Sequence, residues 1–368
     1  MNLHSDIGYF FLRLIRLGLG TEVYTDFPIL KTKQWTAICD MGMKQSVIGI
    51  LLAGIEHLPQ EKRPEKAIMM KLINLCLRIE HQNRILNRKA VEQSDYYIKN
   101  GFSPILLKGQ GVATLYPKPE WRMPGDIDLW LADGRKKVTE FIRKQRPEAE
   151  VLYHHIHLNE NDGMEVEVHT VPTLLYNPFS NRKLQKWFAI WKDLAINVEL
   201  PNSVGTVSVP CDEMNRVFLL IHKYRHLFCE GIGIRQMVDY MMLLRKIFTE
   251  EERVRTVRIL KDLHLTAFCR AVMFVLTDAL GMEREYLLME PDEKAGKLLL
   301  NEIIAAGNFG KYDTRIDRTI KGDSLKSFYY RNKRNMRFLH YFPNEALWGF
   351  YFKIYNWFWR RKNNKYEL

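Results

Sequence analysis

Alternating strand and helix patterns interrupt an otherwise helical chain, and this change of pattern constrains the fold most. Residues 1–100 carry apolar residues at helical spacing, most clearly at 68–79, and residues 211–368 follow a similar pattern. Between them, residues 101–210 alternate short apolar runs with helical segments. We therefore predict an α+β protein: a small mixed β-sheet core at 101–210, flanked by N-terminal helices and a larger C-terminal helical domain.

The elements of the predicted core follow from apolar runs and the turn residues that bound them. We expect strands at 105–107, 126–131, 151–158 and 164–169, helices at 136–144 and 184–191, and a hairpin formed by 195–200 and 204–209. Asp212 is a good N-cap candidate for a helix at 213–228.

Charge and cysteine content limit the partners and the compartment. The 55 Lys and Arg exceed the 43 Asp and Glu, and the net charge of +12 favours anionic partners such as nucleotides, nucleic acid or membranes. The five cysteines never form a Cys-x-x-Cys pair, so neither disulfides nor a cysteine zinc site is expected.

The apolar segment 7–19 is interrupted by Arg13 and Arg16, and no small-residue cleavage site follows it. We expect a cytoplasmic protein without a transmembrane segment.

Acidic residues alternate with apolar ones on two predicted strands. Asp126 and Asp128 share one face of their strand, and Glu165, Glu167 and His169 share one face of another. Carboxylates this close repel each other unless a cation lies between them, and Mg²⁺ is the commonest choice. Carboxylates on adjacent strands can hold two metal ions about 3.5–4 Å apart, which stabilise the attacking and leaving oxygens of nucleotidyl transfer.

A glycine-containing turn precedes the acidic strands. Lys108-Gly109-Gln110-Gly111 follows the apolar run 105–107 and enters a helical segment. Such a turn offers free backbone N–H groups and one ammonium, both suited to phosphate. Each motif alone is weak, but their order on a strand–helix–strand–strand scaffold predicts a metal-dependent nucleotidyltransfer site.

These motifs resemble those of a known family. Residues 106–131 are similar to the signature of the DNA polymerase β-like nucleotidyltransferase superfamily, which is Gly-[Gly/Ser], a spacer and Asp-x-[Asp/Glu]. More narrowly, several segments resemble the uncharacterised bacterial nucleotidyltransferases found near surface-polysaccharide genes: Leu107-Lys108-Gly109, Tyr116-Pro117, Arg122, Gly125-Asp126-Ile127-Asp128, Glu167-Val168-His169, 231–239 and 307–310.

The resemblance implies a palm-like sheet in which Asp126 and Asp128 bind Mg²⁺ (or Mn²⁺) and a nucleoside triphosphate is the substrate. Glu167 matches the third acid, which would bind metal and assist deprotonation of the acceptor hydroxyl. Glu165, which faces the same side, is the reserve. The residues expected to contact the nucleotide are Lys108, Gly109, Gln110, Gly111 and Arg122.

Several polar residues near these motifs have two interpretations. Arg122 either clamps phosphate or forms an ion pair with Asp126 or a neighbour. His169 either lines the pocket or is structural. Arg235 and Asp239 lie four apart on a predicted helix and can pair with each other. The resemblance implies that this pair braces the site from the helical domain.

Histidines gather in two further places. One predicted strand carries three, interpreted as sheet surface or acceptor-pocket lining instead of metal ligands: His154, His155 and His157. His222 and His226 lie four apart on a helix, but Lys223 stands where a zinc metalloprotease motif requires Glu. A basic helix face near the nucleotide is therefore expected.

The segment 347–359 is rich in aromatic residues and ends at Arg360-Arg361-Lys362. It predicts a helix that either packs on the helical domain or makes peripheral contact with a membrane. Packing is favoured because aromatic residues occur nearly all round the helix.

The sequence as a whole predicts a Mg²⁺-dependent nucleotidyltransferase that moves a nucleoside monophosphate from an NTP to an unidentified acceptor. The resemblance links this activity to surface-polysaccharide metabolism. The alternative is a catalytically degenerate member of the fold that binds nucleotide, nucleic acid or a partner. Two features favour the alternative: Gln110 stands where the superfamily prefers a small residue, and the chain is strongly basic.

Overall fold

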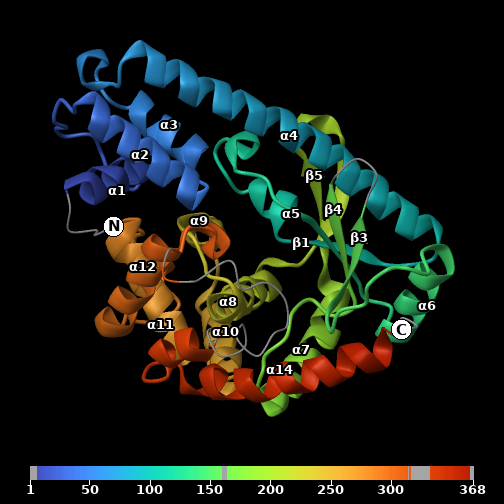
Figure 1. Ribbon diagram of the computed structural model, residues 1–368. Helices are drawn as coiled ribbons and strands as arrows, with labels where there is room; N and C mark the ends of the chain where they lie inside the picture. Colours follow the sequence, from blue (N-terminus) through green and yellow to red (C-terminus); the bar gives the residue numbers. More distant parts are fainter. Residues whose placement is uncertain (1–5, 160–163, 314, 316–331, 365–368) are drawn as a thin grey trace.

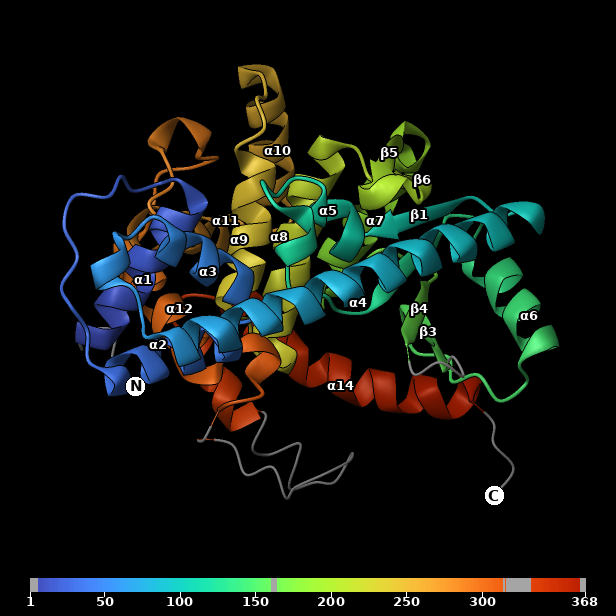
Figure 2. The same ribbon diagram turned by 90° about the horizontal axis from the view of Figure 1, so that it is seen from above.

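A long helix, α4 (Lys66–Lys99), links the N-terminal helices to the sheet (Figure 1). The computed structural model describes residues 6–159, 164–313, 315 and 332–364. Seen from above, α4 crosses the molecule from the N-terminal helices to the sheet (Figure 2). Its buried side chains recur every three or four residues from Leu72 to Tyr97, so one face is covered along most of its length.

The sheet has four strands in the order β1-β2-β4-β3. β2 and β4 run parallel, whereas β1–β2 and β3–β4 are antiparallel. The bounds are β1 (Pro104–Leu107), β2 (Ile127–Leu131), β3 (His155–Asn159) and β4 (Glu165–His169). A two-stranded sheet of β5 (Ile196–Leu200) and β6 (Gly205–Val209) lies beside β1. The predicted α+β class with a small mixed sheet is confirmed.

Several predicted bounds were wrong. Asp126 precedes β2 instead of starting it, and the strand predicted at 151–158 begins only at His155. Val151 forms no more than an isolated bridge to Ile156. Helix α7 starts at Pro178, because the side chain of Asn177 accepts hydrogen bonds from the backbone N–H groups that open it. Residues 160–163, which join the strands predicted at 151–158 and 164–169, lie outside the described residues.

The remaining helices lie around the core and in the C-terminal region. They are α1 (Asp6–Leu19), α2 (Thr32–Gln45), α3 (Ile48–Glu56), α5 (Gly109–Ala113), α6 (Arg135–Gln145), α7 (Pro178–Trp191), α8 (Asp212–Cys229), α9 (Ile234–Leu244), α10 (Glu250–Asp262), α11 (Thr266–Phe274), α12 (Glu293–Ala306) and α14 (Pro343–Asn363). Cys211, and not Asp212, is the N-cap of α8.

The N-terminal and C-terminal helices share one hydrophobic core. Leu14 of α1 and Ile48 of α3 belong to the same buried cluster as Leu243 of α9. The side chain of Gln45 joins the two regions by donating to the Ile303 carbonyl oxygen at 3.1 Å. One face of the sheet, α6 and the second half of α4 form a separate cluster, whereas Ile105, Leu107 and Trp130 on the other face belong to the first cluster. The two helical regions therefore form one body beside the sheet.

Helix α14 packs through one aromatic face. The ring of Phe352 stacks on Tyr176 at 4.8 Å between centroids and meets Tyr153 edge-on at 5.4 Å. The outward side chains of Tyr351, Ile354 and Phe358 are exposed. The segment packs, but these ring contacts are with residues of the predicted core region 101–210 and not with the helical domain. Peripheral membrane contact stays a prediction. Among the described helices, none combines the length and apolar character that crossing a bilayer requires.

Candidate active site

The sheet register brings the predicted acids together. Because β2 and β4 are adjacent and parallel, Asp128 lies directly opposite Glu167, and Asp126 lies just before β2. One carboxylate oxygen from each of the three residues lies within 4.8 Å of the other two. The carboxylates therefore meet on one face of the sheet, from strands about forty residues apart in the chain.

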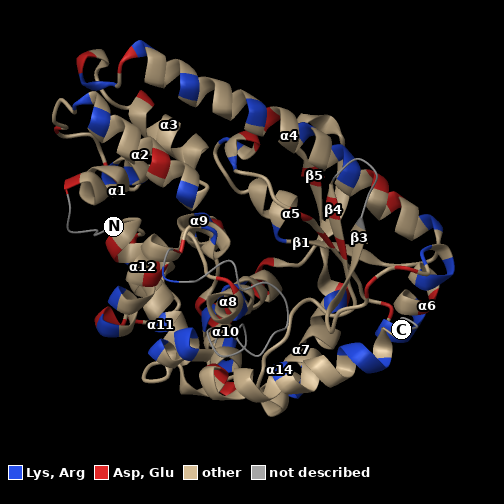
Figure 3. Cartoon of the chain, in the orientation of Figure 1, with Lys and Arg blue, Asp and Glu red and all other residues tan. Residues whose placement is uncertain are grey.

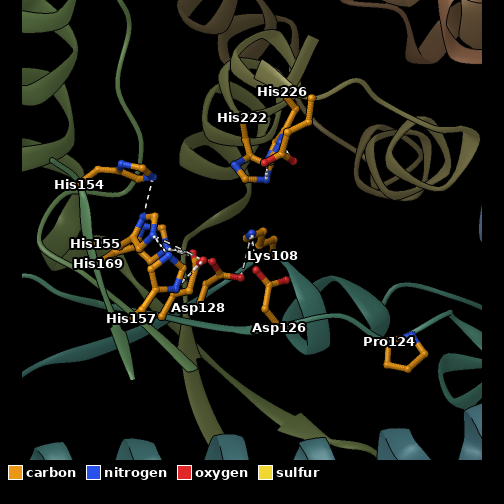
Figure 4. Close-up of polar contacts among 12 residues, drawn as sticks. Lys108, Pro124, Asp126, Asp128, His154, His155, His157, His169, His222 and His226 are labelled. Carbon is orange, nitrogen blue, oxygen red and sulfur yellow. Dashed lines mark hydrogen bonds and ion pairs between the residues drawn. The ribbon is translucent and has the colours of Figure 1, made fainter. Parts of the chain in front are cut away.

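Lys108 reaches into this acidic group. Its Nζ lies 3.0 Å from Asp128 Oδ2 and 3.5 Å from Asp126 Oδ2 (Figure 4). Burial acts to lower the pKa of Lys108, but the carboxylates of Asp126, Asp128 and Glu167 outweigh it and raise the pKa above its ordinary value. Lys108 is also held at a φ of +44°, a region that non-glycine residues rarely occupy. The turn after β1 thus places a permanent cation beside the aspartates.

Asp128 is fully buried, and this sets its protonation. Burial, reinforced by the charge of Asp126, raises the pKa of Asp128 to about 6. The pKa of Asp126 is lowered instead, chiefly because Lys108 is close. His169 Nε2 contacts Asp128 Oδ1 at 2.8 Å, and the Lys108 ammonium lies 3.0 Å from Oδ2. A buried carboxylate that already faces an ammonium lies where positive charge is favourable, which suits a cation.

Glu167 lies between Asp128 and the histidines of β3 and β4. Its Oε2 is 3.3 Å from His169 Nε2, and its Oε1 is 3.5 Å from both His155 Nε2 and His157 Nδ1. Burial acts to raise the pKa of Glu167, but its contact with His169 and the charges nearby leave the pKa well below its ordinary value. Glu167 therefore stays ionised at neutral pH, as a carboxylate that binds a metal ion must be. With the carboxylates of Asp126 and Asp128, it forms an oxygen set that fits Mg²⁺ or Mn²⁺.

The acids open onto a cleft of about 1110 Å³ between the sheet and the C-terminal helices. Its walls include Lys108, Asp126, Glu165, Glu167, His154, His155, His157, His169, His222, Arg225, His226, Glu230, Arg235, Phe309 and Lys311. In the view of Figure 4, His154, His155, His157 and His169 lie to the left of Lys108, and the His222–His226 pair lies above it. Burial lowers the pKa of His155 to about 2, and it also lowers the pKa values of His154 and His222, so these imidazoles are neutral.

Several residues of the cleft wall were not assigned from the sequence, among them Arg225, Phe309 and Lys311. Arg225 of α8 has a buried Nε with no hydrogen-bond partner among the described residues. Its signal in the sequence was helical spacing, since it lies three residues after His222 and shares that helix face. Phe309 and Lys311 come from the loop after α12, where Phe309 lies 5.5 Å from the Arg235 guanidinium.

Two predicted nucleotide contacts point elsewhere. Gln110 is buried and donates to the side-chain oxygens of Asn83 and Asn87 on α4, at 3.2 and 2.6 Å. Gly111 faces β6, where an added Cβ would lie 2.9 Å from Val209 Cγ1. Gly109 lines a small pocket beside Asp126. Helix α5 has only five residues, so the turn presents little of the phosphate cradle that the sequence predicted.

Arg122 and Asp239 form a buried brace behind the acids. Arg122 donates to both carboxylate oxygens of Asp239, at 2.8 and 2.9 Å, and Tyr116 donates a third hydrogen bond at 2.7 Å. Burial acts to raise the pKa of Asp239, but Arg122 outweighs it and lowers the pKa. Arg235 pairs with neither, because it donates to the carbonyl oxygens of Met123 and Pro124, both at 2.9 Å. The predicted Arg235–Asp239 pair is therefore replaced by Arg122–Asp239.

A small mixed sheet with converging carboxylates beside a helical wall is the arrangement expected of a nucleotidyltransferase. Residues 31–281 match the family of uncharacterised nucleotidyltransferases, and the chain belongs to that family. Among solved structures, the chain is similar to an antigenic nucleotidyltransferase-like protein from Paracoccidioides brasiliensis. The two share 14% identity with a TM-score of 0.31, over 56% of this chain and 93% of that one. No curated protein matches the chain.

Proposed function

We propose that the protein transfers a nucleoside monophosphate from an NTP to a hydroxyl or phosphate acceptor and depends on Mg²⁺ or Mn²⁺. The observation that carries this proposal is the convergence of Asp126, Asp128 and Glu167 within 4.8 Å on one sheet face. Divalent cations bound there neutralise charge on the triphosphate and on the leaving pyrophosphate. Little covalent chemistry is asked of the side chains, because positioning and charge neutralisation supply most of the rate.

The residues of the chain take distinct roles in this proposal. The three carboxylates hold the cations, and the lowered pKa of Glu167 suits cation binding better than proton abstraction. Arg225, whose buried Nε has no hydrogen-bond partner among the described residues, is our choice for a triphosphate contact. The cleft exceeds the roughly 300–1,000 Å³ of ordinary small-ligand pockets, so an acceptor fits beside the nucleotide.

The distribution of Lys and Arg over the molecule helps to choose between classes of acceptor. Lys and Arg are spread over α4, α6, α14 and the C-terminal helices instead of forming one stripe (Figure 3). A protein that tracks a nucleic-acid backbone usually concentrates its basic residues on one face. We therefore favour a small or lipid-linked acceptor, such as a sugar phosphate, consistent with the resemblance to proteins of surface-polysaccharide loci.

One observation favours a second candidate, a nucleotide-binding protein without catalysis. Lys108 Nζ already pairs with Asp126 and Asp128, so an internal cation partly neutralises the acids. Catalysis requires this ammonium to leave the aspartates for the triphosphate. Lys108→Ala distinguishes the candidates: a catalytic site loses transfer but still binds Mn²⁺, whereas in a degenerate site the variant gains Mn²⁺ binding that the wild type lacks.

Mass spectrometry tests the proposed activity even while the acceptor is unidentified. The purified protein is incubated with all four NTPs, Mg²⁺ and small-molecule cell extract, and pyrophosphate and new nucleotidyl adducts are measured. We expect a product that Glu167→Gln abolishes and that Glu165→Gln, a matched change on the same strand face, largely retains. Equal product from wild type and Glu167→Gln, or none from any protein, would contradict the proposal.

A further inference from the structure

Imidazoles crowd one edge of the acidic group. The antiparallel pairing of β3 with β4 sets His155 opposite His169 and His157 opposite Glu167, so these side chains leave the same sheet face. One nitrogen from each of His155 and His169 lies within 4.8 Å of the other and of a Glu167 carboxylate oxygen. This group has a different ligand chemistry from the all-oxygen group beside it.

Two separations within this group are close to those between ligands of a single ion. His155 Nε2 and His169 Nε2 lie 3.5 and 3.3 Å from the two oxygens of Glu167. Ligands about 2.1 Å from a tetrahedral metal lie about 3.4 Å from one another. Small side-chain movements would therefore close the three groups around one cation. His169 Nε2 would then exchange its contact with Asp128 Oδ1 for the ion.

A second contact orients one of the imidazoles. His155 Nδ1 lies 2.7 Å from His154 Nε2, so the other ring nitrogen, Nε2, is turned toward Glu167. Metal-binding histidines usually have such a partner on the non-ligating nitrogen, which fixes the ring and its tautomer. The Nε2 of His157, 3.0 Å from His155 Nε2, brings a further nitrogen to the same place.

We propose that His155, Glu167 and His169 form a binding site for a transition-metal ion such as Zn²⁺ or its analogue Co²⁺, next to the carboxylate site. Imidazole nitrogen favours these ions, whereas Mg²⁺ prefers oxygen ligands. This inference deepens the proposed function and rests on it in one respect, because Glu167 is shared by the two sites. The protein would then hold two different cations, one bound by oxygen and one largely by nitrogen.

The opposite wall of the cleft offers a rival position. His222 Nε2 and His226 Nε2 lie 3.0 Å apart, and His226 Nδ1 is 3.3 Å from Glu230 Oε2. Within the described part of the chain, only the His155 group and the three carboxylates bring three ligand atoms within 4.8 Å of one another. His226→Ala is therefore a matched control for the β-strand histidines.

Cobalt binding tests the proposal on the full chain without nucleotide. Metal is removed with EDTA, Co²⁺ is titrated in excess Mg²⁺, and affinity is followed by visible absorption and calorimetry. We expect tight Co²⁺ binding that His155→Ala and His169→Ala each weaken more than about 100-fold, and that His226→Ala leaves unchanged. Circular dichroism checks the fold, and the glutamine variant at the same position replaces any alanine variant that does not fold.

Asp126→Asn separates the two cation sites, because Asp126 belongs only to the carboxylate group. We expect this variant to keep its Co²⁺ affinity. Loss of Co²⁺ binding in Asp126→Asn or in His226→Ala would overturn the proposal, as would wild-type affinity in the His155 and His169 variants. Retained Co²⁺ binding in a wild-type protein that forms no nucleotidyl product would count against the proposed function and leave this site standing.

Discussion

Replacing Asp128 by asparagine should abolish transfer and also stabilise the metal-free protein. Folding raises the pKa of this carboxyl from 3.8 to about 6, so its ionised form costs about 3 kcal/mol at neutral pH. Asparagine keeps the shape and removes the charge. We expect the free energy of unfolding to rise by about 1–3 kcal/mol in EDTA at pH 7.5, because the amide still contacts His169 and Lys108 keeps Asp126.

The same substitution removes a cation ligand, so the transition state loses several kcal/mol of stabilisation. The rate of nucleotidyl transfer should therefore fall by at least about 1000-fold. Chemical denaturation measures the first effect, and nucleotidyl-product formation measures the second. Asp193→Asn, which changes an exposed carboxylate, is the matched control. A variant that unfolds more easily than the wild type would contradict the first expectation, and one that still transfers nucleotide would contradict the second.

Four further outcomes follow from the described contacts. Arg122→Leu leaves its carboxylate partner buried and uncompensated, so it should lower the free energy of unfolding by about 3–5 kcal/mol; unchanged stability with lost nucleotide affinity would restore Arg122 as a phosphate ligand. Gln110→Ser removes a donor to two asparagine oxygens and should cost about 1–3 kcal/mol without improving nucleotide binding; calorimetry showing tighter binding would mean that Gln110 obstructs the site. Arg225→Ala should weaken NTP binding about tenfold or more, whereas the exposed Arg258→Ala should not. The raised pKa of Asp128 stabilises the fold below about pH 4, and this stabilisation is lost as pH rises through about 6; denaturation across pH 4–7 should show the decline in wild type but not in Asp128→Asn.

The alternation of side chains between the two faces of a strand was the main basis for predicting where the acidic residues lie. It placed Glu165, Glu167 and His169 on one face, because side chains of a strand alternate whatever it pairs with. It did not say that Glu167 would stand opposite Asp128, since parallel pairing of β2 with β4 is decided by tertiary packing. The choice of Glu167 over Glu165 came from the resemblance.

The glycines of the turn show where a local pattern misleads. The pattern predicts a phosphate contact for Gly111, yet its missing side chain leaves room for Val209, which an added Cβ would approach to 2.9 Å. Gly231 and Gly233 make similar close approaches to the loop at Gly310 and Asn308. A glycine that leaves room for a ligand cannot be distinguished in the sequence from one that leaves room for a neighbouring part of the chain. Only the packed structure separates them.

In the proposed function the three carboxylates hold the nucleotide only through a divalent cation, and one calorimetric titration measures this requirement. A non-hydrolysable NTP analogue is titrated into the wild type and Asp126→Asn, each with Mg²⁺ and with EDTA. We expect the wild type to bind the analogue in Mg²⁺, and we expect little heat from the wild type in EDTA or from the variant under either condition. Equal affinity under all four conditions would contradict this requirement, because the nucleotide would then be held without the carboxylates.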